Sequence, residues 1–444
     1  MRVINCEKEN LEELQCVQNI VLSSLEEIQR RNKMLEYYKG KNTEIQRKQC
    51  KENSFVTANN KLAVPFASMI SDTITGYFKG LPTTYNTDNE ALLDLLQEND
   101  VDEKDYLLAL DCSIFGIAFE MLYIDDEPKF ERLDPRTCIA CYSNSAGNEL
   151  IGVIRIHKET DWNNGNQISY TDVYTKDAVY SYSGDGNYMN LNFIKKENNI
   201  WNEVPFVVYL NNSAVYGDFE RVISLIDAYD LMLSNNIDSF EAQLHDNYLV
   251  LCGVSFNDEN EADDFFNSVF EDGIIMLKKG AEESGRESAE FISTKTDTAT
   301  VSFTLDKLED LIYSMSQCVR LNDEKVGTAS SGVAIQFKFT PVENLCNAKE
   351  GLFKKGLYRR CEMLLRYINA TTNDKKDLDI IMTRELPVNQ AENAQVLQIY
   401  KNLGVSEETI LANIPIVDDI NQEQWRKKGD IVDGRRQQQQ PTEQ

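Results

Sequence analysis

Two long helices that enclose a short insert are the feature of this sequence that most restricts its fold. Between 217 and 247, apolar side chains recur at steps of three and four residues, and no Pro or Gly follows Gly217. This spacing predicts one uninterrupted helix roughly 45 Å long, well above the average of about three turns. The same spacing predicts a second helix over about 302–320. Since about fifty residues lie between them, we expect a hairpin-like stalk that carries a small head.

The predicted stalk is strongly acidic. Polar positions of its first helix hold seven acids and one base, and the acids include Asp227, Asp230, Asp238 and Glu241. Residues 258–297 add twelve acids against four bases, so the formal net charge of −28 is concentrated in the stalk. Tight nucleic-acid binding needs clustered Lys and Arg, so the charge argues against a protein that grips DNA. It is compatible with a surface that keeps DNA at a distance.

The segments around the stalk predict an α+β chain that is mainly helical. Helical patterns run over 5–38, 88–98 and 103–116. Short β-prone runs between 117 and 210, separated by Asn, Gly and Asp clusters, predict an antiparallel β-rich section. With 42% hydrophobic residues, the chain of 444 residues can bury a sizeable core.

A small, polar segment over 322–332, flanked by glycine, predicts a mobile loop directly after the stalk. A long helix over about 333–369 follows, and Pro341 and Gly351 inside it predict a kink or break. Next come a predicted strand over 379–384 and a pair of short helices. The first of these helices is capped at Asn389 and ends at Gly404, and the second starts at Ser406.

The long helix after the loop reverses the charge of the stalk. Between 346 and 368 it holds six bases against two acids. One interpretation is that these bases face the acidic stalk of a neighbouring subunit, and a solvated basic face is the alternative. The candidate interface residues are Lys354, Lys355, Arg359 and Arg360.

Motifs that carry catalytic or metal chemistry are missing from the sequence. It contains no GxxxxGK[ST], HExxH or GxSxG, and no complete dinucleotide-binding fingerprint. Cys138 and Cys141 form a single CxxC, and with two histidines in the chain we expect neither a redox pair nor a zinc site. No stretch indicates a secretory signal or a membrane span. We therefore expect reduced cysteines and a protein that is not an enzyme and needs no cofactor or metal.

Several short motifs in a fixed order carry a family resemblance from about residue 35 to 415. They are Tyr37-Tyr38-Lys39-Gly40, Asn59-Asn60-Lys61-Leu62, Asp72-Thr73-x-Thr75-Gly76-Tyr77-x-x-Gly80-x-Pro82, Phe115-Gly116-x-Ala118, Glu203-Val204-Pro205-Phe206-Val207, and the run from Asn211-Asn212 through Gly217-Asp218-Phe219-Glu220 to Ser234-Asn235. In this order and spacing the chain resembles the portal proteins of tailed bacteriophages, of the siphovirus type typical of Gram-positive hosts.

The resemblance implies an elongated portal-type subunit with a wing, a two-helix stem, a small α/β clip and a helical crown. Applied to this sequence, it divides the chain into eight segments. These are the wing at 1–216, the first stem helix at 217–247, the clip at 248–299, the second stem helix at 300–321, the tunnel loop at 322–332, a kinked helix with a wing strand at 333–387, the crown at 388–433 and a disordered tail at 434–444.

The resemblance also implies a function. Portal subunits form a ring, usually of twelve copies, at one vertex of the virion capsid, assembled in the host cytoplasm. Double-stranded DNA passes through the ring without sequence specificity during packaging and ejection. The implied partners are the terminase large subunit, a head–tail adaptor, and the major capsid and scaffolding proteins. The tunnel-loop residues at the narrowest part of the channel would be Asp323, Glu324, Lys325, Thr328, Ser330 and Ser331.

Two other classes of protein stay open at this point. One is an acidic oligomeric scaffold, such as a head-completion or capsid-interaction protein, through which no DNA passes. The other is an enzyme with an unrecognised acidic metal site, for which Asp263-Asp264 and Glu282-Glu283 would be candidates. A solvated acidic face is the simpler interpretation of both acidic pairs.

Overall fold

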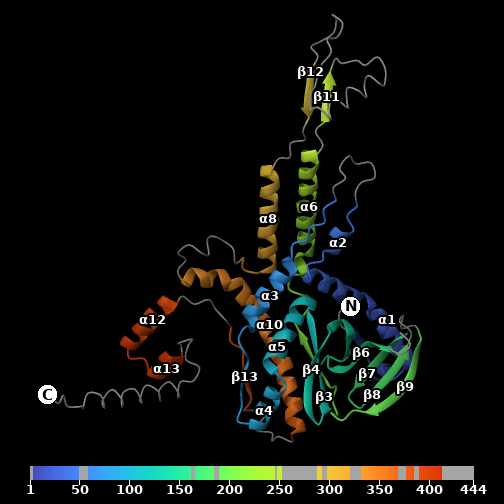
Figure 1. The fold of residues 1–444 in the computed structure, drawn as a ribbon. Coiled ribbons are helices and arrows are strands. Elements are labelled where there is room, and N and C mark those ends of the chain that lie inside the picture. The colour runs from blue at the N-terminus through green and yellow to red at the C-terminus, as the bar shows by residue number, and fades with distance from the viewer. Residues whose placement is uncertain are drawn as a thin grey trace, which may run out of the picture. The chain divides into compact units, whose positions relative to one another are not determined.

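The computed structural model divides the chain into two compact units (Figure 1). The first comprises Met1–Val319 and Pro341–Glu385, and the second comprises Arg320–Thr340 and Leu386–Gln444. Helices hold more of the described residues than strands do, so the predicted α+β class is confirmed, whereas the division into wing, stem, clip and crown stays a prediction. The described residues are 4–49, 59–161, 166–184, 190–245, 248–252, 288–292, 298–320, 332–368, 377–384 and 390–412.

The N-terminal segment differs from the single helix predicted over 5–38. Strand β1 (Ile4–Cys6) comes first, then the 3-10 turn η1 (Lys8–Leu11), and helix α1 (Leu14–Tyr38) starts only after it. Glu7 and Asn10 form a capping box that ends the strand and starts the turn. A helical pattern alone could not reveal this reversal.

Three further helices and a short strand follow α1 in the first unit. The predicted helices at 88–98 and 103–116 are confirmed. The helix before them continues past Gly76, because Tyr77 and Phe78 extend its buried face by another turn. The elements are α2 (Thr43–Gln46), α3 (Phe66–Lys79), β2 (Thr84–Asn86), α4 (Glu90–Glu98) and α5 (Val101–Phe115).

A six-stranded sheet forms the largest β structure, in the order β1-β5-β6-β7-β8-β9. Strand β1 pairs parallel with β5, and every other pair in this sheet is antiparallel. Val17, Ile20 and Val21 of α1 pack into the core that this sheet covers. The strands after β1 are β5 (Cys138–Ser143), β6 (Leu150–Asp161), β7 (Asn166–Thr175), β8 (Ala178–Gly184) and β9 (Leu191–Asn198).

A smaller antiparallel sheet, in the order β10-β3-β4, completes the predicted β-rich section. Phe119, Phe130 and Phe206 from its three strands are fully buried, which makes this sheet part of the core of the first unit. The 3-10 turn η2 (Pro135–Thr137) links it to the larger sheet. Its strands are β3 (Ile117–Asp125), β4 (Glu127–Leu133) and β10 (Phe206–Leu210).

The predicted helical hairpin is present, and α6 and α8 lie side by side (Figure 1). Helix α6 begins later than predicted, because the residues before it form a buried turn, and its 23 residues span roughly 35 Å. Strand β11 pairs antiparallel with β12, and residues 253–287 between them lie outside the described residues. The elements are the 3-10 turn η3 (Glu220–Val222), α6 (Ile223–His245), β11 (Tyr248–Cys252), β12 (Ser288–Ile292) and α8 (Thr298–Ser316).

The long helix α10 (Gly332–Tyr367) continues through Pro341 and Gly351. Of the predicted kink or break, the break is therefore absent, and the kink stays a prediction. The boundary between the two units nevertheless falls at Pro341. Strand β13 (Asp379–Ile381) lies inside the predicted strand and pairs antiparallel with β2. Helix and strand thus return the chain to the first unit.

The second unit contains α12 (Gln390–Asn402) and α13 (Glu407–Ala412). Gly404 has a positive φ of 82°, and the Ser406 hydroxyl accepts a hydrogen bond from the Thr409 amide, so the predicted end and start of these helices are confirmed. Asn389, the rest of the predicted crown and the tail lie outside the described residues. Across the described parts of the chain, no helix combines the length and the apolar character that a membrane span requires.

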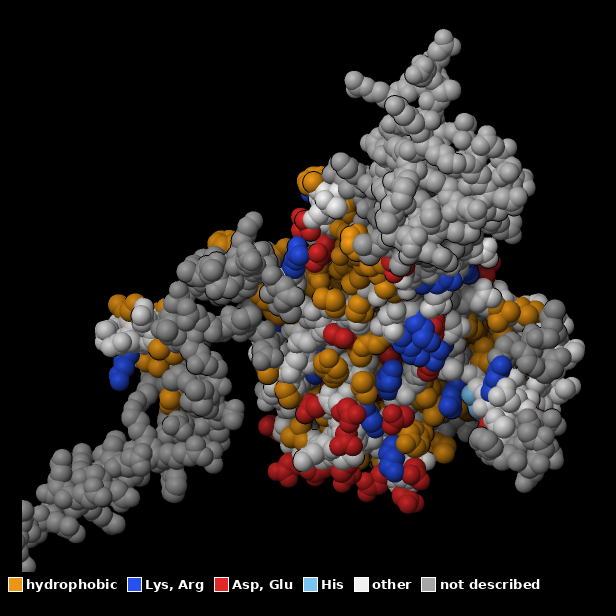
Figure 2. Space-filling view, turned by 45° about the horizontal axis from the view of Figure 1, so that its top comes forward, with side chains coloured by type: hydrophobic (Ala, Val, Ile, Leu, Met, Phe, Trp, Pro, Cys, Tyr) orange, Lys and Arg blue, Asp and Glu red, His pale blue; other side chains and the backbone are white. Residues whose placement is uncertain are grey.

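Acidic side chains also gather outside the hairpin. Figure 2 shows them along the lower edge of the view, at the end of the first unit where Figure 1 places α4. The sequence concentrates the acidic excess in the stalk, and the first unit carries a further group of acids outside it. Exposed acids of α4, of the first turn of α5 and of the turn between β3 and β4 are Glu90, Asp94, Glu98, Asp102, Glu103, Asp125 and Asp126.

Candidate functional site

The turn that leads from β10 into η3 is a close crossing of two backbones. Gly116 has a φ of 83°, and a Cβ on it would lie 2.3 Å from the carbonyl oxygen of Val215. A Cβ on Gly217 would lie 2.5 Å from the carbonyl oxygen of Ile114. Only glycine lets the two segments approach so closely. This explains why two glycine-containing motifs that are far apart in the sequence lie together at the base of the hairpin.

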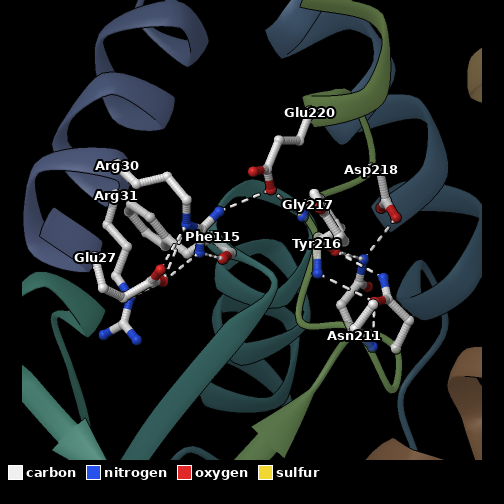
Figure 3. Close-up of polar contacts among 11 residues, drawn as sticks. Glu27, Arg30, Arg31, Phe115, Asn211, Tyr216, Gly217, Asp218 and Glu220 are labelled. Carbon is white, nitrogen blue, oxygen red and sulfur yellow. Dashed lines mark hydrogen bonds and ion pairs between the residues drawn. The ribbon is translucent and has the colours of Figure 1, made fainter. Parts of the chain in front are cut away.

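Asp218 is the centre of a buried polar cluster at this crossing, which we call the socket, and Figure 3 shows its contact with Asn211. Its Oδ2 accepts hydrogen bonds from Ser113 Oγ at 2.7 Å and from Lys349 Nζ at 2.6 Å, and its Oδ1 accepts one from Asn211 Nδ2 at 2.8 Å. The side chains of Asp218 and Lys349 are 2% and 4% exposed. The socket therefore joins the start of the hairpin to α5 and α10 through a desolvated ion pair.

A second ion-paired group ties α1 to the start of the hairpin (Figure 3). Arg30 donates to Glu220 at 2.7 Å, to the Phe115 carbonyl at 2.8 Å and to Glu27 at 2.6 Å. Burial acts to lower the pKa of Arg30, but the carboxylates of Glu27 and Glu220 outweigh it and raise the pKa. The guanidinium therefore stays charged and holds three elements together.

Residues 59–64, here called the strap, run along α6 and bind it through their backbone. Three strap amides donate hydrogen bonds to side-chain oxygens of α6, at every second strap residue. The pairs are Asn60 with Asp238 Oδ1 at 2.8 Å, Leu62 with Ser234 Oγ at 3.0 Å and Val64 with Asp230 Oδ1 at 3.0 Å.

Side chains from the end of α1 and from the segment around α2 add to the hold on α6, and Figure 1 shows α2 beside that helix. Three donors reach three α6 carboxylates. They are the Tyr37 hydroxyl to Asp227 at 2.6 Å, Asn42 Nδ2 to Asp230 at 2.7 Å and Lys48 Nζ to Asp238.

The two buried carboxylates of α6 differ in their electrostatics. Burial raises the pKa of Asp230, even though Asn42 and Val64 donate hydrogen bonds to it. Burial also acts to raise the pKa of Asp238, but the hydrogen bonds from Lys48 and Asn60 outweigh it and lower the pKa. Only Asp238 therefore has a cation that offsets its desolvation.

Two of the four acids named on the first stalk helix, Asp230 and Asp238, do not face solvent. They are 0% and 7% exposed, and both bind the strap. Asp227 is half-buried and accepts the Tyr37 hydroxyl. Glu241 is half-buried too, and its role at a channel stays a prediction.

The prediction that Arg360 faces a neighbouring subunit is wrong. Its side chain is 0% exposed and lies 3.0 Å from Glu120 Oε1, 2.8 Å from Asp105 Oδ1 and against the Tyr85 hydroxyl. The Asp105 contact is an ion pair without hydrogen-bond alignment at that oxygen. Tyr209 donates its hydroxyl to Glu120 at 2.8 Å. Arg360 is thus a core residue that joins α10 to α5, β2 and β3.

The other three candidate interface residues differ from Arg360. Arg359 lies near the carbonyls of Val204 and Phe206, and burial lowers its pKa. Lys354 pairs with Glu350 at 2.7 Å within α10, and Lys355 is exposed. A role for these three between subunits stays a prediction.

The tunnel-loop candidates, from Asp323 to Ser331, lie outside the described residues, as do the acidic pairs at 263–264 and 282–283. Cys138 and Cys141 are both buried free thiols. Within the described ranges, no group of three or more His, Cys, Asp or Glu side chains is arranged to hold a metal ion.

The sequence contained one signal for the anchorage that we did not use. Asp230, Ser234 and Asp238 recur every four residues, so they form a row on one side of α6. This spacing places the three side chains where a single segment of chain can contact all of them. The partners Lys48, Ser113 and Lys349 carried no such signal, because nothing in their local sequence sets them apart.

Several known proteins are similar to this chain. A portal protein of Bacillus phage SPP1 is 23% identical over 387 residues, which cover 82% of this chain and 75% of that protein. A portal protein of Clostridium phage phiCD119 is 24% identical over 395 residues, covering 84% and 85%. Among solved structures, the neck of an empty gene transfer agent (GTA) particle aligns over 78% of this chain and 87% of that chain, with a TM-score of 0.44 and 11% identity.

The family comparison covers nearly the whole chain, including the hairpin, the socket and the strap. The family described as "Phage portal protein, SPP1 Gp6-like" matches residues 19–433. Portal proteins are structural, non-enzymatic components of the capsid, which confirms the expectation that this chain is not an enzyme and does not favour the two other classes. The chain belongs to the SPP1 Gp6-like family of phage portal proteins.

Proposed function

We propose that this chain forms a ring at one vertex of a phage capsid, and that double-stranded DNA enters and leaves the capsid through it. The observation that carries the proposal is the family match over residues 19–433. In this proposal α6 and α8 are the stem that surrounds the DNA path, the residues between them are the clip, and twelve copies close the ring in the host cytoplasm.

The anchorage of α6 supports a role for the hairpin as a channel wall. A wall must keep its position while a stiff, charged polymer moves past it. The socket and the strap hold α6 through a buried ion pair and hydrogen bonds to three of its side chains, rather than through apolar packing alone. Such polar contacts have a defined geometry, so they resist sliding of α6 more than an apolar interface does.

The acidic surface supports passage without binding. Clustered Lys and Arg side chains would bind the DNA phosphates and create deep energy wells along the path. An acidic wall repels DNA and keeps these wells shallow. Since Asp230 and Asp238 are buried, we assign this repulsion to Glu241 and to exposed acids of α8 such as Asp306 and Asp310. The tunnel loop at 322–332, with Lys325 as its one base, is proposed to touch DNA at the narrowest point.

The remaining partners follow from the same proposal. The terminase large subunit and a head–tail adaptor would dock on the ring, and the major capsid and scaffolding proteins would surround it. The chain itself has no recognisable nucleotide-binding motif, so a separate ATPase must drive packaging.

Electron microscopy of the purified protein tests the ring. Twelve- or thirteen-fold rings with an open centre are expected. Solid particles, or particles of single chains at every salt and protein concentration, would instead point to a scaffold without DNA passage.

The loop provides a functional test. Shortening 322–332 should leave ring assembly intact and reduce the amount of DNA packaged or retained. A matched deletion in the tail at 434–444 serves as the control. Normal packaging by the loop deletion would remove the tunnel role from this segment.

A further inference from the structure

The contact between the strap and α6 has a regular pattern. Amides of every second strap residue donate to α6 side chains, and the acceptors Asp230, Ser234 and Asp238 follow every fourth helix residue in the opposite direction. Ser234 also donates its hydroxyl back to the Leu62 carbonyl at 3.5 Å. An aspartate could not do so, which gives a reason for a serine in the middle of the row.

The two repeats match in length. Two residues of an extended chain advance about 6.6 Å, and four residues of a helix advance about 6.0 Å. The mismatch over two steps is on the order of 1 Å, which three hydrogen bonds of ordinary length can absorb. In a longer row the difference between the two repeats would add up until amides and acceptors no longer met. Three contacts are therefore close to the limit for such a pairing.

The sequence of α6 permits this pairing in one position only. The next positions of the same row are Ile226 on one side and Ala242 on the other. Neither side chain can accept a hydrogen bond. If α6 moved by one turn in either direction, one half-buried strap amide would face an apolar side chain and would lose its hydrogen bond.

We propose that the strap is a register lock, in which Asn60, Leu62 and Val64 are positioning residues that fix α6 along its own axis. The socket fixes the start of α6, and the lock fixes its position higher up. Movement of α6 along its axis then requires the strap to detach first, as a step separate from opening of the socket. The register lock is inferred from the contacts between the strap and α6, whatever passes along that helix. Only the effect of the lock on DNA passage rests on the proposed function.

Hydrogen–deuterium exchange on the full chain tests the alternating pattern. Slow exchange is expected at the amides of Leu62 and Val64, and fast exchange at Lys61 and Ala63, whose amides donate no hydrogen bond within the described residues. Equal exchange rates along the strap would overturn the proposal.

A serine pair on α6 tests the coupling. Ser234→Ala removes both bonds to Leu62 and should speed exchange at the Leu62 amide about tenfold, as expected for the loss of up to 1.4 kcal/mol. Ser239→Ala, at an exposed position of the same helix, should leave that rate unchanged. Equal effects of the two variants would contradict the lock.

A proline pair in the strap gives a second measurement that does not depend on Ser234. Leu62→Pro removes a donated amide and should speed exchange at Val64, whereas Ala63→Pro keeps all three donors and should not. Leu62→Ala measures the loss of the side chain alone. Rings seen by electron microscopy without the alternating pattern would refute the lock and keep the proposed function. The alternating exchange pattern without rings would support the lock and contradict the proposed function.

Discussion

Arg360 brings a positive charge to a place where the chain has buried two carboxylates, Asp105 and Glu120. Arg360→Leu leaves Glu120 without a cation and Asp105 with Lys79 alone, whose Nζ lies 3.5 Å from Asp105 Oδ2. Breaking a buried pair in this way costs about 3–5 kcal/mol. We expect urea unfolding to show a loss of that size. Lys355→Leu, at an exposed site five positions away in α10, should change stability by less than about 0.5 kcal/mol. Equal shifts of the two midpoints would mean that Arg360 is solvated.

Asp111 makes the stability depend on pH. Burial raises its pKa to about 6, although Arg132 donates two hydrogen bonds to it. Between about pH 4 and pH 6 the folded state keeps a proton that an unfolded aspartate has released, so this group makes stability fall as pH rises. In urea titrations at pH 4 and 6.5, Asp111→Asn should reduce the loss of unfolding free energy between these two pH values by on the order of 2 kcal/mol. The exposed Asp94→Asn is the control, and an unchanged slope in Asp111→Asn would contradict the assignment.

Single residues are where prediction from the sequence was weakest. Counting charges between 346 and 368 correctly found a basic stretch, yet it could not separate buried Arg360 from exposed Lys355, five positions away. The partners of Arg360 lie 240 and 275 residues earlier in the chain, at Glu120 and Tyr85. Burial of a charge depends on such distant partners, which no local pattern contains.

Within helix α10, two glycines differ in the space around them. A Cβ on Gly351 would meet no atom within 4 Å, whereas a Cβ on Gly356 would lie 2.3 Å from Cε1 of the fully buried Tyr209. Gly351→Ala should raise stability by about 0.5–1 kcal/mol, because alanine costs less entropy in a helix. Gly356→Ala should lower it by about 1–3 kcal/mol through overpacking. Thermal melts that shift in the same direction for both variants would contradict this contrast.

Most elements could be predicted from periodicity, because long amphipathic helices and β-prone runs carry strong local signals. The hairpin, α4, α5 and the β-rich section were found in this way. Strand β1 was missed, since its three residues gain their strand character only by pairing with β5. The strap was missed for a related reason, because an extended segment without apolar alternation has no signature until its partner helix is known.

The whole molecule carries a formal charge of −28, so copies that assemble must overcome repulsion between like charges. Added salt shortens the screening length from about 10 Å at 0.1 M to about 3 Å at 1 M. We therefore expect higher salt to favour oligomers over single chains in sedimentation velocity. If salt instead dissociated the oligomers, attractive ion pairs between subunits would outweigh the repulsion.

The cluster of buried charges around Arg360 can form only late in synthesis of the chain. Tyr85, Asp105 and Glu120 leave the ribosome long before Arg360, which follows Tyr85 by 275 residues. At about 5–20 residues per second, the delay is roughly 15–55 s. During this interval Glu120 has no cation, Asp105 has only Lys79, and β2 has no β13 to pair with. The body of the first unit therefore completes its core only when nearly the whole chain has been made, so a nascent fragment cannot enter an assembly as a finished subunit.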